Sequence, residues 1–226
     1  MRTTTGWQAD GPTATLRRTS LRRRDLRPDD LAIRVDYCGV CHTDLHAVRS
    51  HDGEGGRPLV PGHEFTGVVA ETGPAVTRFS VGDPVAVGNI VDSCGECSMC
   101  RVGRENFCHA FPTLTYGGVD RHDGSTTLGG YSREYVVRDR FAHPLPAGLD
   151  PAAAAPLDLL VGRKKLSSAG SGGRPATTAM LDFCAEHGIT ADIELLPSAR
   201  VNEALERLGR NDVRYRFVLD MSDLAA

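Results

Sequence analysis

The chain has 226 residues, a formal net charge of −3 and a hydrophobic fraction of 40%. Such a chain forms one large or two small globular domains with a core that needs no disulfides. The slightly acidic balance argues against a general nucleic-acid binder, and no apolar run approaches the roughly 18 residues of a membrane-spanning helix. Because the polar N-terminus has no apolar signal core, we expect a cytoplasmic protein with neither nucleic acid nor membrane as partner.

The first 30 residues are polar and contain a run of arginines with three aspartates beside it. This run predicts the water-facing side of a strand or hairpin rather than an anion-binding patch. The run comprises Arg17, Arg18, Arg22, Arg23, Arg24 and Arg27, next to Asp25, Asp29 and Asp30.

From Leu31 onward the pattern is that of short strands. Leu31, Ile33 and Val35 alternate with polar or small residues, which predicts a half-buried strand, and similar runs cover 67–70, 84–91 and 135–137. Glycine and proline separate these runs closely. Many short strands with frequent turns predict a β-barrel or sandwich-like unit over 25–145.

The pattern changes after Asp150. A connection or helix start over 151–157 precedes a Ser- and Gly-rich loop over 162–174. We expect a helix over 176–186, a strand over 191–196, a second helix that begins at an N-cap Ser198, and a closing strand over 214–219. The apolar faces of the two helices comprise Met180, Leu181 and Cys184 in the first, and Val201, Ala204, Leu205 and Leu208 in the second.

Four of the seven cysteines form the pattern Cys94-x-x-Cys97-x-x-Cys100-x7-Cys108. In a reducing compartment, clustered cysteines bind metal more often than they form disulfides. Four thiolates can close around one tetrahedral Zn²⁺, which leaves no open position for chemistry and stabilises the surrounding lobe. An iron–sulfur cluster is the competing interpretation, but the bacterial run has its fourth cysteine after three residues and before a proline. The spacing therefore favours a structural zinc in a lobe over 92–110.

A second group combines a thiol, an imidazole and a carboxylate. Cys41 is followed by His63 and Glu64, while Thr43 and His46 lie close to Cys41 in sequence. This inventory suits a catalytic zinc with an open position and a proton relay.

Several consecutive motifs carry a family resemblance. They are Gly39-Val-Cys-His-Thr-Asp-Leu-His46, Val60-Pro-Gly-His-Glu64, Val81-Gly-Asp83, Val91-Asp-Ser-Cys94 with the cysteine cluster, and Leu128-Gly-Gly-Tyr-Ser132. The segment 25–156 resembles the catalytic domain of zinc-dependent medium-chain alcohol dehydrogenases, and is most similar to their cinnamyl-alcohol-dehydrogenase-like, NADP-preferring branch. The resemblance implies a mainly β fold, a GroES-like, partly open β-barrel with a structural-zinc lobe and an α/β C-terminal segment.

The same resemblance implies a role for each matching residue. Cys41 and His63 would be ligands of the catalytic zinc, and Glu64 a nearby carboxylate that can move onto the metal. Thr43 and His46 would relay the alcohol proton to solvent. The four clustered cysteines would hold the structural zinc, and Cys38 would be packed in a strand.

Part of the family pattern is missing. After a stretch like 153–157 the family continues with a leucine and a cysteine, the third ligand of the catalytic zinc, and then a dinucleotide-binding Rossmann domain. Here Leu157 is followed by Asp158, and 159–224 again resembles the family's C-terminal catalytic segment, including Met180-Leu-Asp-Phe-Cys-Ala-Glu-His-Gly188 and Asp212-Val-Arg-Tyr-Arg-Phe-Val218. We therefore predict a barrel over 1–157 and a completing segment over 158–226, with no Rossmann domain between them.

Two expectations follow for the cofactors. The sequence has no Gly-x-Gly-x-x-Gly fingerprint, and the glycine loop 170–173 lacks its spacing, so NADP is not expected to bind well. Asp158 could replace the missing cysteine as a zinc ligand, or it could be an exposed residue of the junction.

The sequence leaves three functions open. The first is redox-neutral zinc chemistry on a small carbonyl or alcohol, with Thr43, His46 or Glu64 moving protons. The second is residual oxidoreduction with a borrowed or weakly bound NADP(H). The third is a non-catalytic binding module. Removal of the Rossmann domain by design would be compatible with each of these three functions. Apolar surface beside the missing domain would favour a homo-oligomer.

Overall fold

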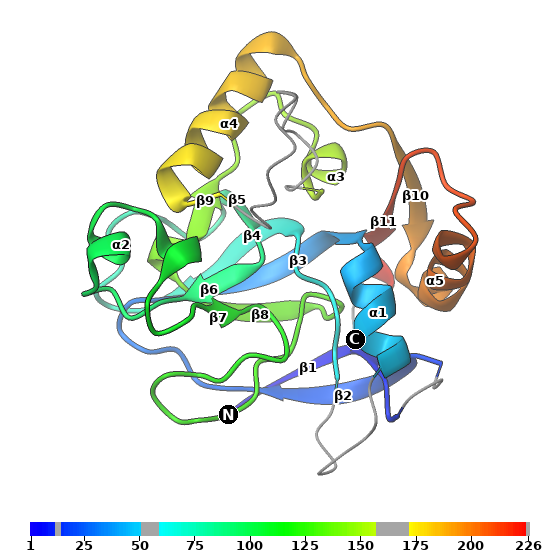
Figure 1. Ribbon diagram of the computed structural model, residues 1–226, viewed down its shortest axis with the longest axis horizontal. Helices are drawn as coiled ribbons and strands as arrows, with labels where there is room; N and C mark the ends of the chain where they lie inside the picture. Colours follow the sequence, from blue (N-terminus) through cyan, green and yellow to red (C-terminus); the bar gives the residue numbers. More distant parts are fainter. Residues whose placement is uncertain (12–14, 51–58, 157–171, 225–226) are drawn as a thin grey trace.

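The computed structural model describes residues 1–11, 15–50, 59–156 and 172–224 (Figure 1). Asp158 and the first half of the glycine loop 170–173 lie outside these ranges. Strands dominate: β1 (Arg2–Gln8), β2 (Arg17–Arg23), β3 (Asp30–Val40), β4 (Phe65–Thr72), β5 (Pro84–Val87), β6 (Ile90–Asp92), β7 (Thr113–Leu114), β8 (Glu134–Arg138), β9 (Ala142–Pro144), β10 (Ile193–Pro197) and β11 (Arg216–Asp220). The helices are α1 (His42–Ser50), α2 (Ser98–Arg101), α3 (Pro151–Ala154), α4 (Arg174–His187) and α5 (Val201–Gly209), with 3₁₀ turns η2 (Glu105–Phe107), η3 (Asp139–Phe141), η5 (Ser198–Arg200) and η6 (Ser222–Leu224). In these described ranges no helix has the length and apolar character needed to cross a membrane.

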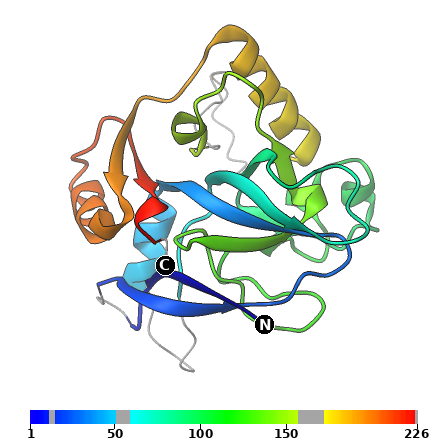
Figure 2. The ribbon, with the colours of Figure 1, turned by 180° about the vertical axis from the view of Figure 1, so that it is seen from behind.

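A seven-stranded sheet joins the two C-terminal strands to strands of the segment 30–144, whereas β1 and β2 pair in a separate two-stranded sheet. The order of the larger sheet is β10-β11-β3-β4-β5-β9, and β8 also pairs with β3. The β10–β11 pair is parallel and the other pairs are antiparallel. The C-terminal strands thus extend the sheet that 30–144 forms, with α1 and α5 beside it in both views (Figures 1 and 2).

Most predicted strands are confirmed, with wider bounds for β3, β4 and β8 and shorter ones for β10 and β11, but the run 84–91 is not one strand. It divides into β5, which pairs with β4 and β9, and β6, which pairs with β7. At the break, the carbonyl of Gly88 accepts a hydrogen bond from Thr115 Oγ1 at 2.6 Å, and that of Asn89 accepts one from Thr115 N at 3.0 Å. The break falls at Gly88 and Asn89, which separate the two apolar halves of the run where the chain changes sheets.

The second C-terminal helix exists, but Ser198 does not cap it. Ser198 begins the turn η5, and α5 starts at Val201 without a side-chain cap. The Ser198 hydroxyl accepts a hydrogen bond from Trp7 Nε1 at 2.8 Å and donates one to Asp223 at 2.5 Å. Tertiary partners therefore use the side chain that local sequence assigns to a cap.

The arginine run is not a uniformly solvated face. Arg17, Arg18 and Arg22 are exposed, as expected, but Arg23 is buried. Its guanidinium donates to the carbonyls of Gly129 and Glu134 at 2.7 and 3.1 Å. Arg23 also contacts the carbonyl of Leu128, the hydroxyl of Ser132 and the face of the Tyr135 ring. The neighbouring Arg24 pairs with Asp30, and Arg27 pairs with Asp120 and Asp123.

Replacing Arg23 by methionine is expected to lower the free energy of unfolding by roughly 3 kcal/mol, because it removes the donor from several buried carbonyls. Chemical denaturation measures this loss. Arg22→Met, at the exposed neighbouring position, is the matched control and should change stability by less than about 0.5 kcal/mol. Equal stabilities for the two variants would show that Arg23 does not hold the 128–134 segment.

Helix α4 confirms the predicted apolar face. Leu181 and Cys184 are buried, and Met180 is partly buried against them. On the same helix, Thr178 Oγ1 lies 3.0 Å from His143 Nδ1 of β9. Burial and the neighbouring positive charges of Arg78 and Arg174 lower the pKa of His143 to about 4.

The low pKa of His143 predicts an acid-sensitive contribution to stability. The folded state keeps this imidazole neutral, whereas the unfolded chain protonates near pH 6.5. The contribution, up to roughly 3 kcal/mol, is therefore complete above pH 6.5 and is lost as the pH falls from 6.5 to 4. His143→Gln should flatten this slope in unfolding measured across pH 4–7, and His187→Gln, on the exposed end of α4, should leave it. An unchanged slope for His143→Gln would contradict the assignment.

Candidate functional site: two cysteine-containing centres

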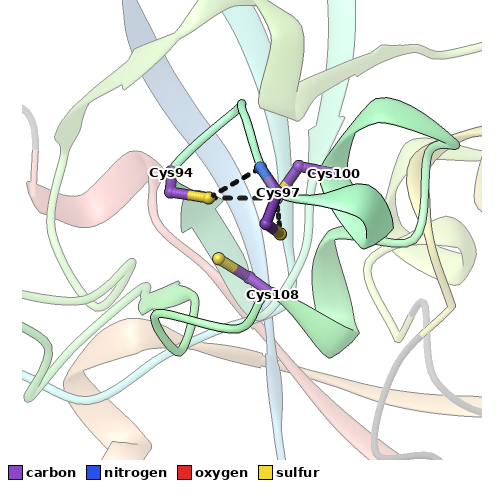
Figure 3. A group of neighbouring side chains, drawn as sticks. All are labelled: Cys94, Cys97, Cys100 and Cys108. Carbon is purple, nitrogen blue, oxygen red and sulfur yellow. Dashed lines mark hydrogen bonds between the residues drawn. The ribbon is translucent and has the colours of Figure 1, made fainter.

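The four clustered cysteines meet in one lobe (Figure 3). Cys94 follows β6, Cys97 and Cys100 flank the start of α2, and Cys108 follows η2. Their sulfur atoms all lie within 4.8 Å of one another. Among the described residues, this is the one cluster of three or more His, Cys, Asp or Glu side chains whose ligand atoms could all reach a single metal ion.

The geometry fits a tetrahedral metal. The Cys100 sulfur lies 3.5 Å from that of Cys97 and 3.8 Å from that of Cys94. A tetrahedron with metal–sulfur bonds of about 2.3 Å has edges of about 3.8 Å. Cys100 and Cys108 are buried, so this arrangement matches a closed site without access for substrate.

A helix that the sequence analysis did not identify positions the second centre. Cys41 lies between β3 and α1, where Asp44 Oδ2 accepts a hydrogen bond from the Cys41 amide at 3.0 Å. Leu45 and Val48 of α1 are buried, facing α5. The helix thus fixes the Cys41 thiol at its own N-terminus.

His63 lies close enough to this thiol that each side chain shifts the pKa of the other. Its Nδ1 lies 3.1 Å from Asp44 Oδ1, an oxygen that also accepts a hydrogen bond from the Gly62 amide at 2.9 Å. This arrangement occupies Nδ1 and leaves Nε2 as the atom that can bind a metal, the usual role of a carboxylate behind a ligating histidine. Asp44 is fully buried, so its carboxylate holds the ring in one orientation.

The charges of this centre reinforce each other. Burial raises the pKa of Cys41, but His63, the Thr43 amide and Arg216 together lower it to about 6. Burial lowers the pKa of His63, but the Asp44 carboxylate and Cys41 raise it to about 11. The Asp44 pKa is lowered despite burial, because His63 and two backbone amides stabilise the carboxylate. A thiolate is therefore favoured at Cys41, which is the form that ligates zinc.

Glu64, the expected nearby carboxylate, is buried beside Arg216 of β11. Arg216 Nη1 lies 3.5 Å from Glu64 Oε1 and donates to the Val40 carbonyl at 3.2 Å. A Cβ atom on Gly39 would come within 2.5 Å of the same carboxylate oxygen, so a larger residue at that position would displace the Glu64 side chain. The described residues thus bring two donors, Cys41 and His63, directly together, with Glu64 held by a cation next to them.

The predicted relay residues lie on α1. Thr43 Oγ1 is 3.7 Å from the Cys41 sulfur, and both Thr43 and His46 are exposed. The His46 ring has its centroid 6.3 Å from that of His42. Both positions are open to solvent, as a relay from the metal to water requires, and their role stays a prediction, as does that of Asp158.

Sequence reasoning gave no role to Asp44, Arg216, Tyr116 or Tyr131. The Tyr116 ring lies 5.8 Å from that of His63, and Tyr131 OH is 3.5 Å from Asp44 Oδ2. Asp44 stands three residues after Cys41, a spacing that predicts a capping carboxylate. No local signal identifies Arg216, because it is 152 positions from Glu64 and meets it only through the β11–β3 pairing.

Comparison with known proteins identifies the family of the chain. The model of the alcohol dehydrogenase GroES-like domain matches residues 27–147. A probable cinnamyl alcohol dehydrogenase from Oryza sativa is 30% identical, with 96% of this chain and 95% of the relative covered. A probable formaldehyde dehydrogenase from Bacillus subtilis is 30% identical, with 93% of this chain and 95% of the relative covered. The alignment with the rice protein runs over 342 positions, more than the 226 residues of this chain.

Solved structures give the same result. A cinnamyl alcohol dehydrogenase from Sorghum bicolor superposes with a TM-score of 0.88 at 28% identity, covering 99% of each chain. The corresponding enzyme from Helicobacter pylori, solved with NADP(H), has a TM-score of 0.87 at 20% identity over 99% of each chain and shows the shared fold. The expectation that NADP is not used finds no support in these relatives. The resemblance of the motifs is confirmed: the chain belongs to the family of zinc-dependent medium-chain alcohol dehydrogenases.

Proposed function

We propose that the chain is a zinc-loaded catalytic domain that acts on a small carbonyl or alcohol at the Cys41–His63 centre, without net oxidation or reduction. The arrangement of Cys41, His63 and Asp44 carries this proposal, since a thiol and an oriented imidazole face each other while Asp44 occupies Nδ1. A zinc ion held by these donors would polarise the oxygen of a carbonyl or alcohol. We also propose that the four-cysteine lobe holds a structural zinc.

The protein's own residues would bind and move protons. Cys41 and His63 supply two ligands, and the third would be Glu64, released from Arg216, or Asp158 outside the described residues. Thr43, whose hydroxyl lies beside the Cys41 sulfur, would accept the substrate proton and pass it towards His46 and solvent. Redox-neutral chemistry is favoured because the sequence lacks a dinucleotide fingerprint, and the long alignment to full-length relatives supports the absence of an internal domain.

The relatives favour a second candidate, NADP(H)-dependent reduction of an aldehyde. A relative from Mycolicibacterium smegmatis, 28% identical, is named an NADP-dependent alcohol dehydrogenase. A cofactor would then bind beside the Cys41–His63 centre or be held by a partner chain. Self-association over the surface beside the absent domain also stays a prediction, which the molar mass in solution tests.

One pair of assays separates the two candidates. Exchange of ¹⁸O from water into benzaldehyde reports carbonyl activation without cofactor, and NADPH oxidation with the same aldehyde reports hydride transfer. The redox-neutral proposal expects zinc-dependent exchange that His63→Ala abolishes, while His187→Ala, at an exposed histidine of α4, retains it. NADPH oxidation above the rate without protein would support the second candidate, and neither activity in the zinc-loaded chain would overturn both.

A further inference from the structure

The four-cysteine lobe contacts the first turn of α4, more than sixty residues further along the chain. Glu105 lies in η2, between the ligands Cys100 and Cys108, and its side chain is buried. Its carboxylate oxygens lie 2.6 Å from Arg174 Nε and 3.4 Å from the Arg174 amide. Arg140 Nη2 approaches the same carboxylate at 3.7 Å.

The Glu105 carboxylate caps the N-terminus of α4 in place of an N-cap side chain. The N-cap residue of α4 is Gly173, which has no side chain to bond the free amides of the first turn. Glu105 accepts from one of those amides and places a negative charge at the positive end of a helix of 14 residues. Its lowered pKa, which Arg174 causes against the effect of burial, fits an ionised carboxylate at this position.

The backbones of the lobe and of α4 also touch. A Cβ atom on Gly173 would come within 2.1 Å of the Gly103 carbonyl oxygen, and one on Gly103 within 2.8 Å of Pro175 Cγ. Gly103 has a φ of +74°, in the left-handed region that favours glycine. Such a close approach holds only while the loop 101–108 keeps its shape.

We propose that the metal-loaded lobe is a latch for α4: ligation by Cys100 and Cys108 fixes η2, so that Glu105 can cap and hold the first turn of that helix. The latch rests on the structural zinc proposed above. By linkage, the coupling is reciprocal. If the metal stabilises docked α4, the docked helix must raise the lobe's metal affinity by the same factor.

Reciprocity makes the latch testable at a residue that is not one of the four cysteines. Arg174→Lys keeps the positive charge but removes the planar guanidinium. The matched control is Arg207→Lys, because Arg207 of α5 also pairs with two carboxylates, those of Glu194 and Asp212. Both are made in a His63→Ala background, so that the lobe is the metal site under study. Zinc affinity is measured by competition with a chromophoric chelator, and the docking of α4 by amide hydrogen exchange.

The latch predicts that Arg174→Lys lowers zinc affinity about tenfold and speeds exchange in α4, whereas Arg207→Lys changes neither. Glu105→Gln should reproduce the effect, and zinc removal from the parent should speed exchange in α4 as well. Unchanged affinity in Arg174→Lys, together with unchanged α4 exchange on zinc removal, would overturn the latch alone. A lobe that binds no zinc in any variant would overturn the proposed structural zinc and the latch with it.

Discussion

Replacing Cys100 by serine is expected to remove one zinc ion from each chain and to lower the melting temperature by roughly 10 °C. Cys100 is buried, and its sulfur lies 3.5 Å from that of Cys97 and 3.8 Å from that of Cys94. Loss of one thiolate opens the tetrahedron, and metal binding in such sites contributes folding free energy directly. A loss of roughly 4 kcal/mol shifts the midpoint of a chain of this size by about 10 °C.

The control for Cys100→Ser is a buried cysteine outside the lobe. Cys184 of α4 packs in an apolar cluster with Leu181, so Cys184→Ala should cost packing energy but leave the zinc content unchanged. Elemental mass spectrometry and thermal unfolding measure the two quantities. A Cys100→Ser chain that keeps its full zinc content would show that the lobe is not a metal site.

Replacing Asp44 by asparagine is expected to weaken zinc binding at Cys41–His63 by ten- to a hundredfold. Asp44 is fully buried, and each of its two oxygens accepts hydrogen bonds. Asparagine has one oxygen and one NH₂ group, so its NH₂ would meet N–H donors on one side. The His63 ring would lose its fixed orientation, and stability should fall by roughly 3 kcal/mol.

Tyr131→Phe is the matched control for Asp44→Asn, because it removes only a long contact of 3.5 Å to the same carboxylate. Its zinc affinity should stay within about twofold of the parent. Affinity for the second zinc is measured by chelator competition after the lobe is saturated. Equal affinities for Asp44→Asn and the parent would mean that His63 needs no partner to bind metal.

The sequence predicted the elements whose signal is local. The β3 region was predicted because Leu31, Ile33 and Val35 alternate with polar or small residues, although the structure also buries Ala32 between them. Helix α4 was predicted because its apolar residues repeat at helical spacing, and the structure shows that it ends at Gly188, with a φ of +63°. The potential metal ligands of the lobe were also predicted from the sequence, since Cys94, Cys97, Cys100 and Cys108 come together in the fold as their spacing indicated.

What the sequence missed depends on distant partners. In the sequence, nothing distinguishes Arg23 from the exposed arginines beside it. In the fold it is buried because backbone carbonyls of 128–134 accept its hydrogen bonds. Ser198 has the chemistry of a cap, but Trp7 and Asp223, far away in sequence, use its hydroxyl. Helix α1 was not predicted because its sequence is mostly polar. Its two buried apolar residues, Leu45 and Val48, are covered by α5, which is distant in sequence.

The number of zinc ions per chain tests the central claim most directly. Elemental mass spectrometry on the full chain, set against an accurate protein concentration, should give two. Cys100→Ser and His63→Ala should each give one, and the double variant none. A parent chain with one zinc that His63→Ala retains would contradict the account, because the Cys41–His63 centre would then hold no metal.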